Sequence, residues 1–357
     1  MRFIASEENV RVTGRTLVVG EVRYLGYSGS SVSFCFAGKT AKALIVSDAD
    51  HWPAELKGRI AVYIDDAKEP AQRICLDREE AWYTLYESDE ERKVTVTLVK
   101  YSEAPFGLCG VKELEIDTDR LLDAPAHKER KIEIIGDSIT CGYGVEAAGE
   151  MIPFHTETEN PAKSYSLLTA DLLDAEANLV SWSGNGIISH YVEETAVERR
   201  IEGGLMPKVY QFTDMSGSAR LCGADENTWE RWDFKRFVPQ VIVVNLGTND
   251  GSWCKEIPER KEHYGKEYIA FLRSIRANNP EAQILCILGT MDRRLVPTLE
   301  QAVGEYSEEQ KDDRVHFLAL PEHTAADGYG ADWHPSSLTQ EKTAKLVAAK
   351  VRKIMNW

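Results

Sequence analysis

The sequence predicts two domains, a β-sandwich followed by an α/β domain whose parallel sheet carries helices on both faces. The 357 residues exceed the length at which single hydrophobic cores usually stop growing, about 250 to 300 residues. Short β-rich runs fill residues 8–118 with hardly any helical periodicity between them, whereas strands alternate with helices after residue 130. A polar, proline-containing segment separates the two patterns, so we place the boundary near residues 119–130 and the domains at 1–120 and 121–357.

The predicted strands of the first domain are short and separated by turn residues. In residues 93–100, valines and a leucine alternate with threonines, which is typical of a strand with one face buried and one face in water. Closely spaced strands of this kind favour a β-sandwich. We expect strands at 16–19, 32–36, 43–46, 59–64, 81–86, 93–100 and 111–116.

The second domain is predicted to contain parallel strands joined by helices. Its strand candidates alternate with helical segments, and such a β-α-β-α series indicates a parallel sheet covered by helices on both faces. Asn160 and Pro161 mark the start of the first helix, with Tyr165, Leu168 and Leu172 on one face. The strands are expected at 131–136, 177–182, 240–246, 283–288 and 314–320.

Two further helices follow in this domain. One spans about residues 260–278 and ends before Pro280, and the other begins near Ser336. Apolar residues recur along both at helical spacing. They are Tyr264, Tyr268, Phe271, Leu272 and Ile275 in the former, and Leu346, Val347, Val351, Ile354 and Met355 in the latter.

The composition disfavours binding to several kinds of partner. A formal charge of −16, from 42 basic and 58 acidic residues, disfavours binding to nucleic acid or anionic membranes. The N-terminus lacks the apolar region of a signal peptide, and no apolar stretch approaches the ~20 residues of a membrane span. We therefore expect a cytoplasmic protein, although a secreted protein trimmed of its signal peptide would look the same.

Cysteine and histidine spacing predicts neither a disulfide framework nor a metal site. The 7 cysteines are odd in number, scattered, and never spaced as CxxC, so we interpret them as reduced and mostly buried thiols. HExxH and clustered metal-ligand patterns are also absent from the sequence. We expect no metal and no cofactor.

Polar segments follow the predicted strands of the second domain. Ligand sites in open α/β sheets lie beyond the carboxyl ends of the strands, so these segments are expected to converge. They are Gly136-Asp137-Ser138 after the first strand, Ser183-Gly184-Asn185 after the second, Gly247-Thr248-Asn249-Asp250 after the third, and Asp332-Trp333-His334-Pro335 after the fifth.

These segments contain the parts that acyl transfer requires. A serine hydroxyl needs a base within hydrogen-bond reach and donors for the developing oxyanion. Ser138 is the candidate nucleophile. His334 is the candidate base, because Pro335 follows it and the last helix starts directly after, which fixes the loop that presents it. The Ser138 and Gly184 backbone N–H groups and the Asn249 amide form the candidate oxyanion hole. The alternative is that Gly184 and Asn249 only shape turns, as Asp137 and Asp250 are expected to do.

The four segments resemble the blocks of the SGNH (GDSL-type) hydrolases over residues 131–357. The preceding β-domain and the Asp-Trp-His-Pro segment resemble carbohydrate esterase family 2. Its members pair a jelly-roll β-sandwich with a flavodoxin-like SGNH domain and remove acetyl groups from plant polysaccharides. The resemblance implies a serine esterase that deacetylates saccharides, with no cofactor.

One departure leaves the third catalytic member open. SGNH hydrolases usually place an aspartate three residues before the histidine, where this chain has Ala331, whereas Asp332 lies two residues before it. Some family 2 esterases instead use the main-chain carbonyl of the tryptophan before the histidine. Either the Asp332 carboxylate or the Trp333 carbonyl is therefore expected to orient His334.

Aromatic residues near the segments are candidates for sugar binding. Tyr191, Trp253 and Trp333 lie close in sequence to the second, third and fourth segments. By resemblance to family 2, an aromatic at Tyr191 packs on a sugar face, and the alternative is that these side chains are core.

Two rival functions accompany the leading one, acetyl ester hydrolysis on an oligosaccharide. The first is a lipase or thioesterase acting on other small acyl esters. The second is a non-catalytic carbohydrate-binding protein. The sequence leaves open the sugar, the hydroxyl position and the oligomeric state.

Overall fold

The computed structural model describes residues 1–196 and 199–357. The chain divides into two compact units. The first comprises residues 1–128, 155–159 and 213–231, and the second comprises residues 129–154, 160–212 and 232–357. Two short segments from the C-terminal two thirds of the chain thus belong to the first unit.

The first unit is an antiparallel sheet that curls around its own core. The main strand order is β3-β4-β9-β5-β8-β6-β7, with β1 on β9 and β2 on β5. Its β-sandwich class was predicted correctly. The strands are β1 (Arg2–Ile4), β2 (Arg11–Thr13), β3 (Thr16–Val19), β4 (Val22–Leu25), β5 (Ser31–Val46), β6 (Arg59–Ile64), β7 (Gln72–Cys75), β8 (Glu80–Lys100) and β9 (Gly110–Ile116).

Strands β5 and β8 are each longer than predicted. The sequence suggested two separate strands in each, but β5 and β8 pair continuously across irregular registers at Gly38/Thr40 and Ala41/Lys42. Such irregularities bend a strand without ending it, so one strand serves both sides of the core. Within the polar segment 87–92 of β8, Glu87 pairs with Thr40 and Arg92 pairs with Gly38, while residues 88–91 lie in the irregularity between these two pairs, and the side chains of the segment are largely exposed.

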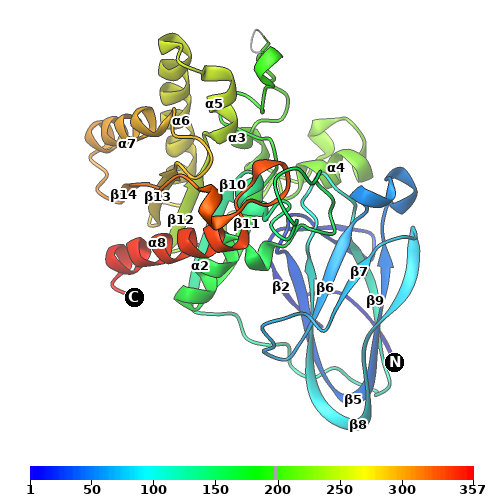
Figure 1. Ribbon diagram of the computed structural model, residues 1–357. Coiled ribbons are helices and arrows are strands. Elements are labelled where there is room, and N and C mark those ends of the chain that lie inside the picture. Colours follow the sequence, from blue (N-terminus) through cyan, green and yellow to red (C-terminus); the bar gives the residue numbers. More distant parts are fainter. Residues whose placement is uncertain (197–198) are drawn as a thin grey trace. The chain divides into compact units, whose positions relative to one another are not determined.

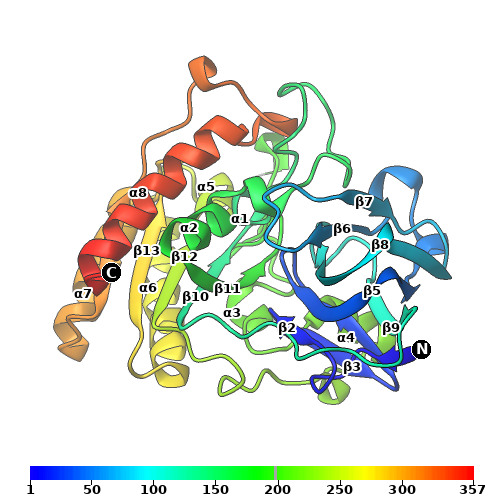
Figure 2. The ribbon, with the colours of Figure 1, turned by 90° about the horizontal axis from the view of Figure 1, so that it is seen from below.

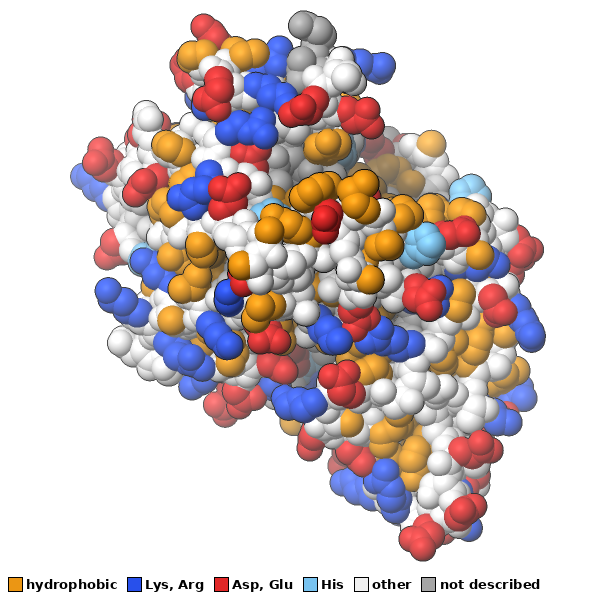
Figure 3. All heavy atoms as spheres, viewed as in Figure 1, with side chains coloured by type: hydrophobic (Ala, Val, Ile, Leu, Met, Phe, Trp, Pro, Cys, Tyr) orange, Lys and Arg blue, Asp and Glu red, His pale blue; other side chains and the backbone are white. Residues whose placement is uncertain are grey.

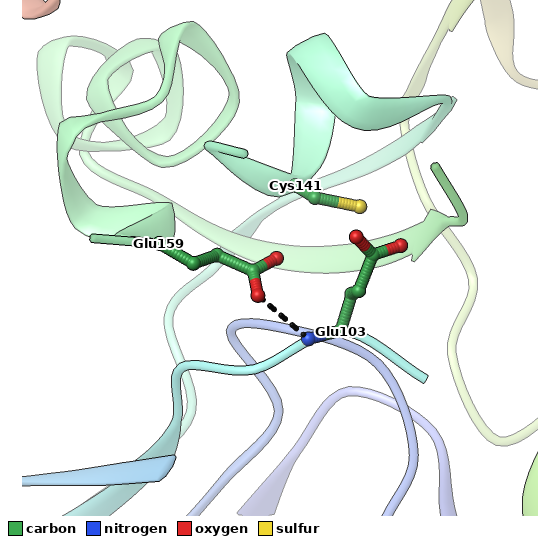
Figure 4. A group of neighbouring side chains, drawn as sticks. All are labelled: Glu103, Cys141 and Glu159. Carbon is green, nitrogen blue, oxygen red and sulfur yellow. Dashed lines mark hydrogen bonds between the residues drawn. The ribbon is translucent and has the colours of Figure 1, made fainter. Parts of the chain in front are cut away.

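A buried pair of carboxyl groups lies in the first unit. The Glu103 backbone N–H donates to Glu159 Oε2 at 3.2 Å, and carboxylate oxygens of the two residues lie within 4.8 Å of one another (Figure 4). Burial, and then the charge of Glu103, raise the pKa of Glu159 well above its usual value. Burial in the folded chain therefore favours the protonated form of Glu159 more than exposure to water would.

The second unit is a five-stranded parallel sheet in the order β11-β10-β12-β13-β14. All four pairings are parallel, which is the flavodoxin-like order that the fold class implied. The strands are β10 (Arg130–Gly136), β11 (Ala175–Ser181), β12 (Val241–Asn245), β13 (Gln283–Leu288) and β14 (Val315–Ala319).

Helices cover both faces of this sheet, as predicted. Figures 1 and 2 show α2 with α8 on one face and α6 with α7 on the other. Helix α7 was missed in the sequence. The helices of this unit are α1 (Ser138–Cys141), α2 (Tyr165–Leu173), α3 (Met206–Val209), α5 (Thr248–Cys254), α6 (Pro258–Asn278), α7 (Val296–Gln310) and α8 (Ser337–Met355); α4 (Met215–Cys222) belongs to the first unit.

The faces of the predicted helices are mostly as expected. In α6, all five predicted apolar residues are buried. In α2, however, Leu172 is 41% exposed and Leu173 is buried instead, and in α8 Leu346 is 42% exposed. A short 3-10 turn capped by Asn160 precedes α2, which itself begins after Ser164, so the buried face is rotated relative to our expectation.

The charged surface and the polarity of the described helices both agree with the amino-acid composition. On the face shown in Figure 3, acidic and basic side chains are interspersed. Among the helices of residues 1–196 and 199–357, none combines the length and apolarity that crossing a bilayer requires.

Candidate active site

The turn after β10 places Ser138 at the carboxyl edge of the parallel sheet. Asp137 caps helix α1, with its side chain accepting the Ile139 N–H at 3.0 Å. Ser138 opens the helix, so its backbone N–H has no intrahelical acceptor and points into the space before the helix. The residue is only 6% exposed, and its hydroxyl has one defined partner, His334.

His334 reaches Ser138 from the segment before α8. Its Nε2 lies 2.8 Å from Ser138 Oγ. Ser336 caps α8 by accepting the Thr339 N–H at 3.2 Å, which fixes the chain just beyond the histidine. The sequence thus identified two side chains that the fold does bring together.

The Nδ1 atom of His334 faces main-chain carbonyls. It lies 3.0 Å from the Ala331 oxygen and 3.2 Å from the Asp332 main-chain oxygen. Since carbonyls only accept, Nδ1 carries the proton and Nε2 is free to accept one from Ser138. Neither acceptor that we expected occupies this position. The Asp332 carboxylate bonds elsewhere, and the carbonyls are those of the two residues before Trp333.

The backbone of this turn explains the difference. Asp332 and Trp333 both have left-handed backbones, with φ of 48° and 63°. An extended loop would have alternated the side chains. The left-handed turn instead directs two successive carbonyls at Nδ1. Such a conformation costs about 1–3 kcal/mol per non-glycine residue, so it needs compensating contacts.

Burial makes His334 a weaker base than an exposed histidine. Desolvation lowers its pKa to about 4, and the hydrogen bonds to Ala331 and Asp332 act in the opposite direction. The imidazole is therefore neutral at pH 7, which is the state that a general base requires.

Gly184 and Asn249 lie after the neighbouring strands, as predicted. Gly184 has φ of 73°, a left-handed conformation that favours glycine. The Asn249 side-chain amide donates to the Asn185 carbonyl at 2.8 Å and to Asp137 Oδ2 at 3.2 Å. Asp137 thus contacts both the turn of the nucleophile and the amide that we assigned to the oxyanion hole.

Asp250 holds the loop after Gly184 in place. Its buried carboxylate accepts the N–H groups of Ile187, Ile188 and Ser189 at 3.0, 2.7 and 3.1 Å. Burial raises its pKa to about 6, while the three N–H donors lower it. The bonds span about sixty residues of sequence, so Asp250 fixes one site segment against another rather than shaping only its own turn.

The predicted sugar-binding aromatics differ in their surroundings. Trp333 is 52% exposed with Tyr329 at 5.2 Å between ring centroids, and Tyr191 is 54% exposed. Trp253 instead has the guanidinium groups of Arg200 and Arg260 at 5.5 and 4.4 Å from its ring centroid. Trp333 and Tyr191 therefore offer open aromatic surface, and the ring of Trp253 is already engaged.

Tyr143 is a site residue that sequence reasoning missed. Its ring packs on His334 with centroids 4.2 Å apart and on Phe154 with centroids 3.9 Å apart. Its hydroxyl donates to Asp332 Oδ2 at 2.9 Å. The sequence did offer one signal for Tyr143, since it lies five residues after Ser138 and directly after Gly142, the C-cap of α1.

The site offers no obvious place for a metal. Within the described residues, no three His, Cys, Asp or Glu side chains converge on Ser138 and His334 as metal ligands would.

Comparisons with known proteins agree with this geometry. Residues 134–342 match the GDSL-like lipase/acylhydrolase family, and residues 12–125 match the carbohydrate esterase 2 N-terminal domain. The chain is 31% identical to the cellulase/esterase CelE of Acetivibrio thermocellus, over 93% of this chain and 38% of that protein. It is 30% identical to an acetylxylan esterase/glucomannan deacetylase of Cellvibrio japonicus, over 99% of this chain and 91% of that protein.

A solved structure is similar along almost its whole length. It is a family two carbohydrate esterase from Clostridium thermocellum in complex with cellohexaose, with a TM-score of 0.84 and 29% identity over 98% of this chain and 99% of that chain. The similarity therefore extends over both units and not only over the four site segments.

Proposed function

The chain belongs to the GDSL-like lipase/acylhydrolase family and carries the N-terminal domain of carbohydrate esterase family 2, and we propose that it removes O-acetyl groups from oligosaccharides through Ser138 and His334. It is a carboxylic ester hydrolase. One observation carries the proposed chemistry. Ser138 Oγ lies 2.8 Å from a histidine nitrogen whose ring is held in the accepting tautomer by two carbonyls.

In the first step, His334 Nε2 takes the hydroxyl proton while Ser138 Oγ attacks the acetyl carbonyl. The imidazolium that forms donates to the Ala331 and Asp332 main-chain carbonyls through Nδ1. The sugar alkoxide then leaves with the proton from Nε2. Water then attacks the acetyl-serine while His334 Nε2 takes one of its protons. The acyl–Oγ bond breaks, Nε2 returns the proton to Ser138 Oγ, and acetate is released.

The oxyanion of each tetrahedral intermediate is held by three proposed donors, the backbone N–H groups of Ser138 and Gly184 and the amide of Asn249. The amide hydrogen that contacts Asp137 is the one that would turn to the oxyanion, because its 3.2 Å bond is longer than the 2.8 Å bond to Asn185. Losing one such donor typically costs about 2.7 to 4 kcal/mol of transition-state stabilisation.

A saccharide is the proposed leaving group. Trp333 directly precedes His334, and Tyr191 lies on the segment that follows Gly184. Their exposed rings provide apolar faces on which a pyranose can stack. Relatives of this chain are carbohydrate esterases, including a glucomannan deacetylase and an enzyme solved with cellohexaose. The acidic net charge of −16 suits a neutral polysaccharide rather than a phosphorylated ligand.

The proposed nucleophile is tested by Ser138→Ala. We expect hydrolysis of 4-nitrophenyl acetate to fall about 10⁴-fold or more, because the remaining groups bind the ester without forming an acyl-enzyme. Ser88→Ala, in β8 of the other unit, is the control and should match the unsubstituted protein. Substantial activity in Ser138→Ala would contradict the assignment. An unsubstituted protein that binds cello- or xylo-oligosaccharides without hydrolysing esters would instead favour a carbohydrate-binding function.

The rival within the hydrolases, a lipase or thioesterase, is separated by acyl-chain length. We expect kcat/KM to be higher for acetyl than for octanoyl esters, since the proposed substrate carries an acetyl group and the exposed aromatics are assigned to the sugar leaving group rather than to an acyl chain. Parallel measurements with 4-nitrophenyl acetate and octanoate make the comparison. A preference for octanoate would support the rival.

The pH dependence follows from the lowered pKa of His334. Only the neutral imidazole acts as base, so kcat/KM of the free enzyme should rise with pH through a midpoint near 4 and stay level through neutrality. Acetate release is the suitable measurement, with circular dichroism at each pH to verify folding. A midpoint near the ordinary histidine value, about 6.5, would show that burial does not control the base.

A further inference from the structure

We propose that Asp332 and Tyr143 are positioning residues, a hydrogen-bonded pair that holds the turn and the aromatic surface against which His334 works. The inference rests on the proposed function of Ser138 and His334. It assigns the carboxylate nearest the histidine in sequence a role other than that of the acid in a catalytic triad.

The hydrogen bonds of Asp332 lead away from the imidazole. Its Oδ2 accepts the Tyr143 hydroxyl at 2.9 Å and the Phe154 backbone N–H at 3.2 Å. Its own backbone N–H donates to the Ile152 carbonyl at 3.3 Å. Three bonds therefore tie this residue to the segment 143–154, and they offset the strain of its left-handed backbone.

That backbone is what presents the carbonyls to Nδ1. With Asp332 at φ 48° and Trp333 at φ 63°, the oxygens of Ala331 and Asp332 converge on one ring nitrogen at 3.0 and 3.2 Å. If the turn relaxed to an extended conformation, these carbonyls would diverge. The Asp332 carboxylate thus acts on His334 through the turn rather than by contact.

Tyr143 supports the other side of the ring. Phe154, Tyr143 and His334 form a stack with centroid separations of 3.9 and 4.2 Å and interplanar angles of 14° and 31°. The bond to Asp332 fixes the tyrosine in this stack. When the imidazole becomes charged during proton transfer, the aromatic face beside it attracts the cation.

The chain on either side of Tyr143 joins the nucleophile to this turn. Tyr143 donates its backbone N–H to the Ser138 carbonyl at 3.1 Å, and the Gly144 carbonyl accepts the Ala331 N–H at 3.0 Å. A Cβ at Gly144 would lie 2.3 Å from that of Ala331, so the two backbones pack closely there. Tyr143 therefore lies on a short link between Ser138 and the turn before His334.

Substitutions at Asp332 distinguish a positioning role from a triad role. Asn keeps an oxygen that accepts from Tyr143 and Phe154, so we expect kcat of Asp332→Asn to stay within about threefold of the unsubstituted enzyme. Asp332→Ala loses the acceptor, and we expect kcat to fall about tenfold or more as His334 is misplaced. In a triad, by contrast, Asn itself would lower kcat about 10⁴-fold.

The coupling to Tyr143 is measured with a double-mutant cycle. We expect Tyr143→Phe to lower kcat about as much as Asp332→Ala, with little change in KM, and the double variant to be no worse than the poorer single variant. Asp327→Ala, which removes a carboxylate of the same loop that pairs with Lys342 at 2.6 Å, is the matched control and should keep full activity. Melting temperatures identify any variant that is merely unfolded.

A measurement without substrate keeps the inference separate from the proposed function. Nitrogen NMR of labelled histidine reports the tautomer and pKa of His334. In Asp332→Asn we expect the proton to stay on Nδ1 and the pKa to fall slightly, because the carboxylate charge favours the imidazolium while neighbouring His323 opposes it. A tautomer switch in this variant, a 10⁴-fold loss of kcat, or additive effects of Tyr143→Phe and Asp332→Ala would overturn the inference. Absence of esterase activity in the unsubstituted protein would overturn the proposed function alone.

Discussion

The contact between Ser138 Oγ and His334 Nε2 is the interaction on which the rest of the site depends. It joins residues 196 positions apart at 2.8 Å, which requires both chain segments to be held rigidly. On one side, a buried strand ends in a capped turn that opens a helix with Ser138. On the other, a strained turn and the cap of α8 fix His334. The parallel sheet supplies the common edge, and Asp250 ties the loop that contains Gly184 to the helix that contains Asn249.

The sequence predicted the structure well where local patterns of apolar residues decide it. The strands of the second unit are recognisable because a parallel sheet buried on both faces requires continuous apolar runs, and the site segments follow their ends. Ser138, Gly184, Asn249 and His334 were therefore found together with the fold. Long strands in the first unit were misread as pairs of strands, since pairing with a distant partner, and not local polarity, decides where β5 and β8 end.

The partner of His334 Nδ1 could not be predicted for a similar reason. Spacing shows that Asp332 is near the histidine, but the sign of its φ angle decides whether its carboxylate or its carbonyl faces the ring. That sign depends on the Tyr143 hydroxyl and the Phe154 N–H, which lie almost two hundred residues earlier in the chain. The resemblance to family 2 offered the Trp333 carbonyl as one alternative to the Asp332 carboxylate, whereas in the structure the Ala331 and Asp332 carbonyls face Nδ1.

The account depends on an acetyl group passing through Ser138. Rapid quenching of the protein with an acetylated gluco- or xylo-oligosaccharide, followed by mass spectrometry of its peptides, tests this directly. The account predicts that the peptide containing Ser138 transiently gains the mass of one acetyl group, at a rate that matches acetate release. Release of acetate with no acetylated peptide at any quench time, or with the acetyl group on another residue, would contradict it.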